Sequence, residues 1–225
     1  LAALDASGAE VVGGRWLIVQ QAATRTARAV AWGLGCRLGN GGAAYRRQPP
    51  PPPGDVDTVP YGCWRKSTWG RLGGFNEALL TNEDYEFNWR VRRAGGRVFF
   101  DPAIVSTYVA RPTLSSLARQ YFRYGWWKAQ MLRSHPRSLC WRQALPGLLP
   151  LGLTVPPVFA LYLLALVWAA VRAVNVLVIP ALLTEHIAWA AGFWTNLITR
   201  ARWPAWRAAA GATTLLPRLV GAASD

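Results

Sequence analysis

The stretch Asn82-Glu83-Asp84-Tyr85-Glu86, followed by Trp89-Arg90-Val91-Arg92-Arg93, says most about the fold of this chain. It places three of only 11 acidic residues within four positions of a protein whose formal net charge is +14. Thr81 or Asn82 can cap a helix here, two carboxylates then lie in its first turn, and Gly95-Gly96 can end it. The stretch therefore predicts a helix that begins with clustered carboxylates. A short apolar strand, Arg97–Phe100, is expected after it, ending at Asp101-Pro102, and another strand at Glu10–Gly14.

Two interpretations of these carboxylates are open. They can simply complement the dipole of the helix, which is the commoner role of such a pair. Successive helical side chains point about 100° apart, so Glu83 and Asp84 cannot serve one spot equally, and one of them is free to face a cleft. Glu86 and Arg90 are spaced i,i+4, which predicts an exposed ion pair worth roughly a few tenths of a kcal/mol.

The C-terminal half contains a long uncharged stretch. Apolar residues make up 52% of the 225 residues, charged residues only 16%, and no charge occurs from Gln143 to Val171. That length exceeds the roughly 20 residues that cross a bilayer, so the stretch predicts a transmembrane helix rather than a buried core helix. Its core, Val158–Val171, lacks proline and glycine, whereas Pro146, Pro150, Pro156 and Pro157 precede it and are expected to kink or delay its start.

Residues Ala173–Ile198 predict a second, poorer crossing. They are apolar, but Pro180 interrupts them, and Glu185 with its neighbour His186 would have to face protein, water or headgroups. Such a Glu-His pair is more often structural than a ligand or a proton relay. Basic residues on both sides of the apolar block favour two crossings with both ends in the cytoplasm. They are Arg119, Arg123, Lys128, Arg133, Arg137 and Arg142 before it, and Arg200, Arg202, Arg207 and Arg218 after it.

The segment Ser115–Met131 interleaves aromatic with basic side chains. A basic, aromatic-rich helix just before a transmembrane segment is typical of one that lies at the membrane interface. The same composition suits stacking on nucleic acid. The adjacent apolar spans favour the membrane, so the positive charge is expected to attract anionic lipid and diphosphate groups, with no nucleic-acid partner.

An ordered set of motifs carries a family resemblance. The motifs lie between about residue 8 and about residue 130, and the order in which they recur is more specific than any one of them. They are Val12-Gly13-Gly14, Gly39-Asn40-Gly41-Gly42 with Tyr45-Arg46, Asp57-Thr58-Val59 with Gly62, Arg65, Gly73-Gly74-Phe75-Asn76-Glu77, Asn82–Glu86, Arg90, Gly95-Gly96 and Gln120–Arg123. In this order they resemble the inverting family-2 glycosyltransferases, in particular the membrane-associated enzymes that build bacterial exopolysaccharides of the succinoglycan type.

The resemblance implies roles for individual residues. Asp84 would be the general base that takes the proton of an acceptor hydroxyl, and Glu83 would orient the acceptor or hold the motif. The amides at the helix start lower the pKa of Asp84 while neighbouring carboxylates raise it, so its net direction is left open. Gln120 and Arg123 match a Gln-x-x-Arg-Trp element that binds the leaving diphosphate, with Tyr124 in the place of Trp. Gly62 would also belong to the substrate site.

The resemblance also implies parts that this sequence does not supply. The family holds a divalent metal, Mg or Mn, through an Asp-x-Asp pair in a nucleotide-binding half, and no such pair precedes Glu10–Gly14. Asp55-Val56-Asp57 has the spacing, but its place in the chain corresponds to the acceptor side, so no metal ligand is assigned here. Because no replacement motif occurs, the sequence favours an N-terminally truncated fragment over a remnant gene.

These observations predict an α/β chain in four parts. Residues 1–112 form the acceptor-side part of a GT-A-like fold, 113–142 an interfacial helix, 143–198 two transmembrane helices, and 199–225 a cytoplasmic tail. The expected activity is transfer of a sugar from a nucleotide-diphosphate donor to a lipid-linked or polysaccharide acceptor, with inversion, at the cytoplasmic face of the cell membrane. The alternative is a catalytically inactive, membrane-anchored fragment that binds a partner or polyanion.

Overall fold

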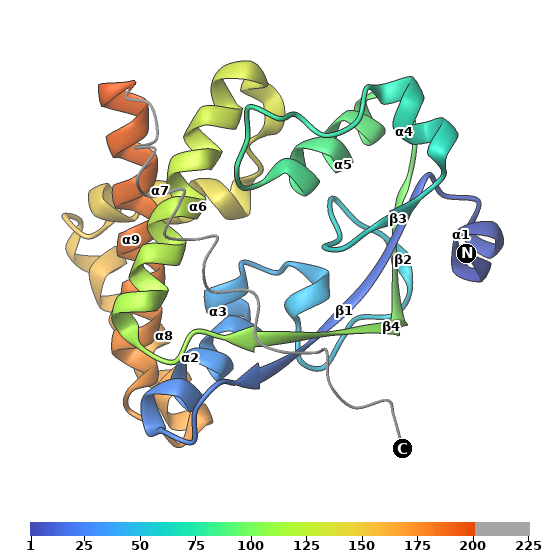
Figure 1. Cartoon of the computed structure of the whole chain (residues 1–225). Coiled ribbons are helices and arrows are strands. Elements are labelled where there is room, and N and C mark those ends of the chain that lie inside the picture. Colours follow the sequence, from blue (N-terminus) through green and yellow to red (C-terminus); the bar gives the residue numbers. More distant parts are fainter. Residues whose placement is uncertain (201–225) are drawn as a thin grey trace, which may run out of the picture.

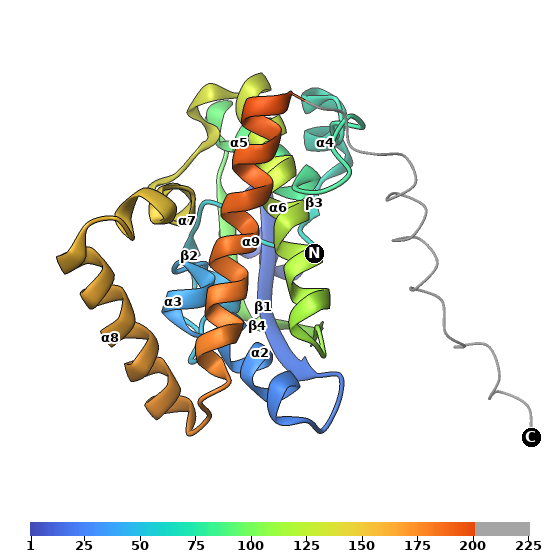
Figure 2. The same cartoon turned by 90° about the vertical axis from the view of Figure 1, so that its left-hand side faces the viewer.

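The structure, a computed structural model, describes residues 1–200. A four-stranded sheet stands beside a layer of long helices, and the two sides are bridged by shorter helices (Figures 1 and 2). The expected mixture of strands and helices is confirmed. Nearly all of the predicted tail, residues 201–225, lies outside the described residues.

Two long strands form the centre of the sheet. β1 (Val11–Gln20) runs parallel to β4 (Val98–Ala110), and the order across the sheet is β2-β4-β1-β3. The edges are short: β2 (Gly54–Asp55) is antiparallel to β4, and β3 (Cys63–Trp64) is antiparallel to β1. The strands expected near Glu10–Gly14 and Arg97–Phe100 are confirmed, and both are longer than the sequence indicated.

β4 does not end at Asp101-Pro102, where the sequence placed its end. The register jumps from Gly13 opposite Phe100 to Arg15 opposite Val105, so residues 101–104 bulge out between them. Proline has no N–H to donate to the ladder, which explains the interruption. Gly14 allows pairing to resume, because a Cβ there would collide with the carbonyl of Ile104.

Short helices fill the connection between β1 and β4 and precede it. They are α1 (Ala2–Ser7), α2 (Arg25–Gly35), α3 (Arg37–Asn40), η1 (Ala44–Arg46), α4 (Lys66–Leu72) and α5 (Glu83–Arg93). α5 is the predicted acidic helix, and it ends as expected where Gly95 adopts a positive φ of 81°. Its start differs from the prediction. Asn82 occupies the cap position with a φ of 70°, and its side chain makes no cap hydrogen bond.

The Glu86–Arg90 pair is buried, which corrects the prediction of an exposed ion pair. The Glu86 side chain is 1% exposed. Its two carboxylate oxygens accept from Nε and Nη2 of Arg90 at 2.8 and 2.9 Å, and His135 Nε2 lies 2.8 Å from Oε1. Arg90 also donates to the carbonyls of Leu72 and Gly74. A paired carboxylate fixes α5 here, so Glu86 is structural.

α6 (Leu114–Ser134) and α9 (Val178–Thr199) form a closely packed pair (Figure 2). A Cβ on Gly125 would collide with the carbonyl of Trp189, and one on Gly192 with the carbonyl of Phe122. The backbones therefore touch where the helices cross. Near the C-terminal ends, Arg133 donates to the carbonyl of Asn196.

The aromatic side chains of α6 are buried in protein, which corrects the reason for expecting an interfacial helix. Tyr121, Trp126 and Trp127 are each about 6% exposed and pack in the core. Lys128 is buried too. Its Nζ donates to the carbonyl of Ser138 at 3.0 Å, and burial lowers its pKa to about 7. Packing accounts for this composition without lipid, and the position of α6 relative to a membrane stays a prediction.

The two apolar segments at the C-terminal end differ. After η2 (Pro136–Ser138) and α7 (Trp141–Gly152), α8 (Pro156–Ala173) confirms the expected helix, with its prolines in the first turn. Among the described residues, α8 alone is long and apolar enough to cross a membrane, and 17% of it is buried inside the protein. α9 does not meet that test and packs against α2, α6, α7 and α8. The second predicted crossing is not confirmed.

Candidate active site

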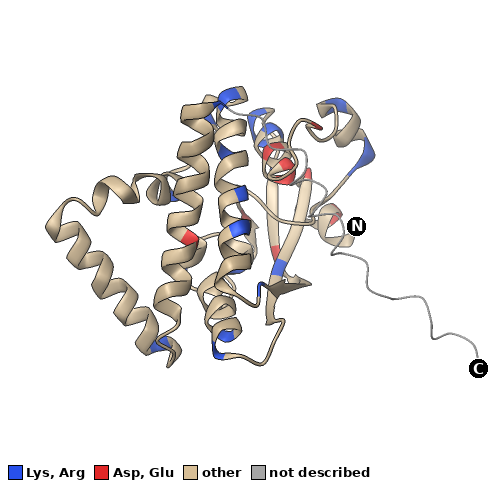
Figure 3. Ribbon diagram, turned by 60° about the vertical axis from the view of Figure 1, so that its left-hand side comes forward, with Lys and Arg blue, Asp and Glu red and all other residues tan. Residues whose placement is uncertain are grey.

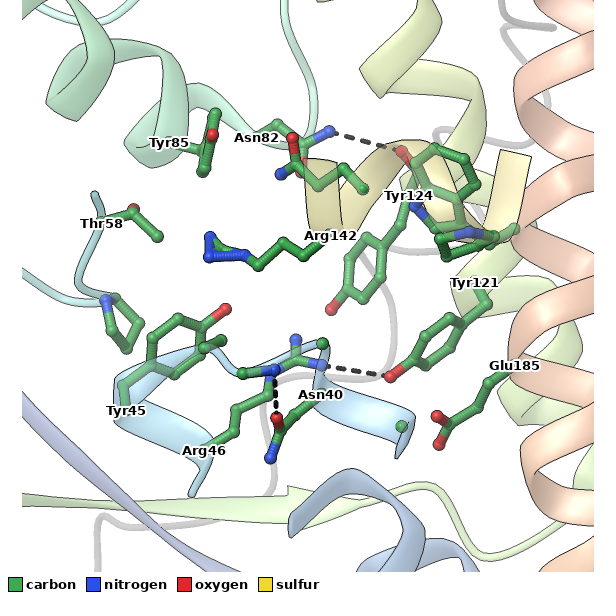
Figure 4. A pocket seen from close by; sticks show the side chains of 18 of the residues that line it. Asn40, Tyr45, Arg46, Thr58, Asn82, Tyr85, Tyr121, Tyr124, Arg142 and Glu185 are labelled. Atoms are coloured by element: carbon green, nitrogen blue, oxygen red, sulfur yellow. Dashed lines mark hydrogen bonds between the residues drawn. The ribbon is translucent and has the colours of Figure 1, made fainter. Parts of the chain in front are cut away.

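A cavity of about 1040 Å³ lies where the sheet, α5 and the long helices meet. Such a volume is at the upper end of the range for small-molecule sites. Its walls include the turn from α3 to η1, the start of α5, the middle of α6, α7, and the facing sides of α8 and α9 (Figure 4). Segments that are far apart in the chain therefore converge on one space.

Asp84 lies in the wall of this cavity, at the first turn of α5. Its Oδ1 accepts from the backbone N–H of Tyr85 at 2.6 Å. Burial, and then the negative charge of Glu83, raises the pKa of Asp84 to about 6, against weaker lowering by two backbone amides and by Arg46. The sequence left this direction open. A carboxylate that titrates near neutral pH is suited to accept a proton from a ligand hydroxyl.

Glu83 and Asn82 complete the acidic end of the cavity. Both line it, and Asn82 Nδ2 donates to the backbone carbonyl of Tyr124 at 3.4 Å. This contact ties the start of α5 to the middle of α6, and Asp84 and Arg123 line one cavity. Figure 3 marks the acidic residues of α5 in red and the basic residues of α6 in blue.

The Gln-x-x-Arg element divides between the cavity wall and the layer behind it. Arg123 and Tyr124 line the cavity. Gln120 is buried and donates from Nε2 to the hydroxyls of Tyr108 and Tyr124, both at 3.0 Å. It therefore holds two tyrosines in place, and its predicted contact with the diphosphate stays a prediction.

Gly62 also lies outside the cavity wall, although Pro60 and Tyr61 belong to it. A Cβ on Gly62 would lie 2.8 Å from Cγ1 of Val11, so close packing against β1 accounts for this glycine. Its predicted contact with substrate stays a prediction.

Sequence reasoning gave no role to Arg46, which lies at the centre of the cavity wall (Figure 4). Its guanidinium carbon lies 4.9 Å from the ring centre of Trp16 and 5.4 Å from that of Tyr45, and Nη1 donates to the hydroxyl of Tyr121 at 3.1 Å. Trp16 in turn stacks on Tyr108 with ring centres 4.0 Å apart. The Tyr45-Arg46 motif was visible in the sequence, but Trp16 and Tyr121, which also hold Arg46, come from β1 and α6.

Sequence reasoning also missed the wall formed by α8 and α9. His186 bridges two other elements: its Nδ1 lies 2.8 Å from the hydroxyl of Tyr162 and its Nε2 lies 3.0 Å from the carbonyl of Leu38. Glu185 faces the same space and is fully buried, with neither carboxylate oxygen hydrogen-bonded within the described residues. Glu185 and His186 do not pair with each other, so they serve separate contacts.

The residues present do not fit a divalent metal. No group of three or more His, Cys, Asp or Glu side chains in residues 1–200 is placed to hold one. Asp55 accepts from Arg97 through both oxygens, and Asp57 forms an ion pair with Arg142. Guanidinium groups thus engage both members of the Asp-x-Asp pair. That this pair is no metal site stays a prediction, and no chemical step is derived through a metal.

A carboxylate of near-neutral pKa that faces guanidinium groups across a cavity is suited to transfer between a hydroxyl and an anionic leaving group. Comparison with known proteins agrees with that class. The chain is 30% identical over 195 residues to the succinoglycan biosynthesis protein ExoA of Rhizobium meliloti (strain 1021), covering 76% of this chain and 56% of that protein. The chain thus spans about half the length of this relative.

A second similarity is shorter. Over 67 residues the chain is 30% identical to the dolichyl N-acetyl-alpha-D-glucosaminyl phosphate 3-beta-D-2,3-diacetamido-2,3-dideoxy-beta-D-glucuronosyltransferase of Methanococcus voltae, covering 30% of this chain and 21% of that protein. No protein-family model and no solved structure matches the chain. The two similarities support a relationship to a glycosyltransferase family.

Proposed function

We propose that this chain is the acceptor-side part of an inverting family-2 glycosyltransferase of exopolysaccharide biosynthesis. It would serve the transfer of a sugar from a nucleotide-diphosphate donor to a lipid-linked or polysaccharide acceptor. The observation that carries the proposal is Asp84: a carboxylate in the wall of a large cavity, its pKa raised to about 6, on the helix opposite Arg123. The similarity to the succinoglycan biosynthesis protein supplies the substrate class.

The proposed reaction needs one proton acceptor and one place for negative charge. Asp84 takes the proton of the acceptor hydroxyl while the oxygen of that hydroxyl attacks the anomeric carbon of the donor sugar. The bond between that carbon and the diphosphate oxygen breaks on the opposite face, and the nucleoside diphosphate leaves with the electron pair, which inverts the anomeric configuration. Arg123 stabilises the charge of the leaving group, because a guanidinium can bind two phosphate oxygens at once.

Transfer assays on membranes test the role of Asp84. Membranes that contain the protein are incubated with a panel of labelled nucleotide sugars, and label is counted in the lipid and polymer fractions. Loss of a general base costs about 10²- to 10⁴-fold, so Asp84→Asn should reduce transfer by about 100-fold or more. Glu77→Gln is the matched control, since that carboxylate is exposed on the loop before α5.

The results of this assay distinguish a glycosyltransferase from an inactive binding module. Near-normal transfer by Asp84→Asn would remove the base from this position. Absence of transfer in the wild-type protein with every donor would instead favour the inactive, membrane-anchored binding module that the sequence left as an alternative.

Attachment to the cell membrane, with the cavity on the cytoplasmic side, is part of the proposal, and α8 is the attaching element. The sequence favours a multi-pass arrangement in which Ala173–Ile198 crosses back. The contacts at both ends of α8 favour attachment from one side: Trp194 Nε1 donates to the carbonyl of Gly147 at 2.7 Å, and Asn175 Nδ2 donates to that of Arg25 at 2.9 Å. Both ends thus join one folded body.

Val174 distinguishes the two arrangements, because it follows α8 and is 91% exposed. We expect Val174→Cys and Leu139→Cys both to be shielded from an impermeant thiol reagent on intact cells, and both to react after permeabilisation. Labelling of position 174 alone from outside would restore the multi-pass arrangement.

A further inference from the structure

Arg46 differs from Arg142, another guanidinium group of the cavity, in what holds it. Arg142 pairs with Asp57, but no ion pair within the described residues involves Arg46. Aromatic groups hold it instead, the rings of Trp16 and Tyr45 and the hydroxyl of Tyr121. An aromatic ring attracts a cation through its quadrupole and does not neutralise it. The positive charge of Arg46 is therefore fixed in place and still available.

The hydrogen-bonding capacity of Arg46 is also largely unused. A guanidinium carries five N–H donors, and one donor–acceptor contact, from Nη1 to Tyr121, is present in the described structure. Its Nε is buried without a partner. A half-buried cation whose Nε is buried without a partner is costly unless an anion completes it. The aromatic side chains position the guanidinium of Arg46 but carry no negative charge, so a ligand would have to supply the anion.

The wall beside Arg46 leaves room for such a ligand. Gly41 and Gly42 line the cavity with positive φ angles of 58° and 83°, and a Cβ on Gly42 would meet nothing within 4 Å. A ligand can therefore come close to the backbone of this turn. The carboxylates of Asp84 and Glu185 also face the cavity and oppose an anion, so the ligand must gain from a directional contact with the guanidinium.

We infer that Arg46 binds a phosphoryl group of a ligand in this cavity, as a second anion-binding position beside Arg123. This inference rests on the proposed function for the kind of ligand, since that reaction offers two sources of phosphate. One is the diphosphate of the nucleotide-sugar donor, and the other is the diphosphate that links an acceptor to its lipid. Planar, two-point contact with phosphate oxygens is the chemistry that both share.

Calorimetric titration with inorganic pyrophosphate, at fixed ionic strength in detergent, tests the site without any transfer reaction. We expect Arg46→Gln to weaken binding by about 10-fold or more, since a charge-assisted contact is worth about 1.5 to 3 kcal/mol. Arg46→Lys should weaken it less, because it keeps the charge and loses the planar fork. Arg119→Gln is the matched control: it removes the same charge from an exposed position on α6 and should leave affinity within about 2-fold.

Several results would overturn the inference. They are wild-type affinity in Arg46→Gln, equal weakening in Arg46→Gln and Arg119→Gln, and no binding of pyrophosphate to the wild-type protein at millimolar concentration. If Arg46→Gln does not fold, as judged by its thermal transition, Arg46→Lys and Tyr121→Phe decide. Tyr121→Phe keeps the charge and removes the hydrogen bond that orients the guanidinium, so unchanged affinity in both variants would refute the site.

Competition assigns the source. Displacement of pyrophosphate by nucleoside diphosphates such as UDP or GDP places the donor at Arg46, whereas displacement by farnesyl diphosphate alone places the lipid-linked acceptor there. Displacement by neither would refute the inference. The proposed function fails independently: binding that depends on Arg46, in membranes that transfer no sugar, would leave this site standing without the enzyme.

Discussion

α8 and α9 follow one another in the chain and are similarly apolar, yet the fold uses them in opposite ways. α9 is enclosed by α2, α6, α7 and α8, and it carries Glu185, His186 and Asn196 among its buried residues. α8 contains no charged residue before Arg172, and most of its large side chains are exposed (Figure 3). Buried polar and small residues are therefore typical of α9, which packs inside the protein. α8 lacks such polar residues and exposes an apolar surface that suits contact with lipid.

The largest expected effect comes from filling the contact between α6 and α9. Gly192→Leu places a Cβ against the backbone carbonyl of Phe122. Because the Cβ itself collides, no rotamer of the leucine side chain relieves the clash. We expect loss of the folded state or destabilisation by about 3 kcal/mol or more, as in severe overpacking. Thermal unfolding in detergent measures it.

Ala160→Leu on α8 is the control for that substitution. Ala160 is exposed, so the same enlargement should change stability by less than about 0.5 kcal/mol. Equal damage from both variants would mean that α8 is as tightly packed as α9, and the contrast between the two helices would fail.

A charge on the outer face of α8 tests the other half of the contrast. Leu164 is 65% exposed, and an aspartate in an apolar membrane helix costs up to about 3 kcal/mol. We expect Leu164→Asp to release the protein from membranes in carbonate, where the wild type remains bound, and to leave thermal unfolding in detergent nearly unchanged. A wild-type protein that carbonate also releases would show that the exposed face of α8 does not hold the protein to membranes.

The acidic helix and the uncharged helix were predictable because each rests on a local pattern: clustered carboxylates before a glycine pair, and a span without charge or proline. The enclosure of α9 was not predictable, because it depends on Gly125 of α6 lying against Trp189 and Gly192 of α9 lying against Phe122. Composition alone also misled at α6, where buried Trp126, Trp127 and Lys128 looked like membrane-interface residues. Pairings between distant segments decide these points, and periodicity does not report them.

The same was true within the candidate site. Asp84 and Arg123 were predicted from motifs and do face one cavity. Arg46 and Glu185 were given no role, because their environment is assembled from β1, η1, α6 and α9. Gln120, which the motif assigned to the substrate, also donates to two tyrosines, a contact that the motif did not indicate.

Two carboxylates of α5, those of Glu86 and Asp84, show the same kind of contrast. Glu86 is enclosed by Arg90 and His135, whereas burial raises the pKa of Asp84 to about 6 from an ordinary 3.8. A raised carboxyl pKa means that the protein is more stable when Asp84 is protonated. The contribution of Asp84 to the free energy of unfolding is therefore greatest below pH 3.8, the ordinary pKa, and is lost as pH rises through about 6, the pKa in the folded protein. Removing the charge should therefore stabilise the protein at alkaline pH.

Asp84→Asn should raise the free energy of unfolding at pH 8 by about 1 to 2 kcal/mol, within a limit of about 3 set by the pKa difference. At pH 4 the gain should largely disappear. A variant that loses transfer and gains stability would show that the buried charge is retained for function. If Asp84→Asn is destabilised at pH 8, the carboxylate contributes a structural contact that the cavity geometry does not reveal.

The smallest expected effect concerns Glu83, which neighbours Asp84 and contributes the second-largest cause of its raised pKa. Glu83→Gln removes that like charge, so the pKa of Asp84 should fall, while burial still holds it above the ordinary 3.8. A general base works in its ionised form, so transfer declines as pH falls through its pKa. The acid limb of the pH profile of kcat/KM should move to lower pH by the same amount. An unmoved limb, with kcat reduced, would make Glu83 a contact for the acceptor and leave burial alone responsible for the pKa of Asp84.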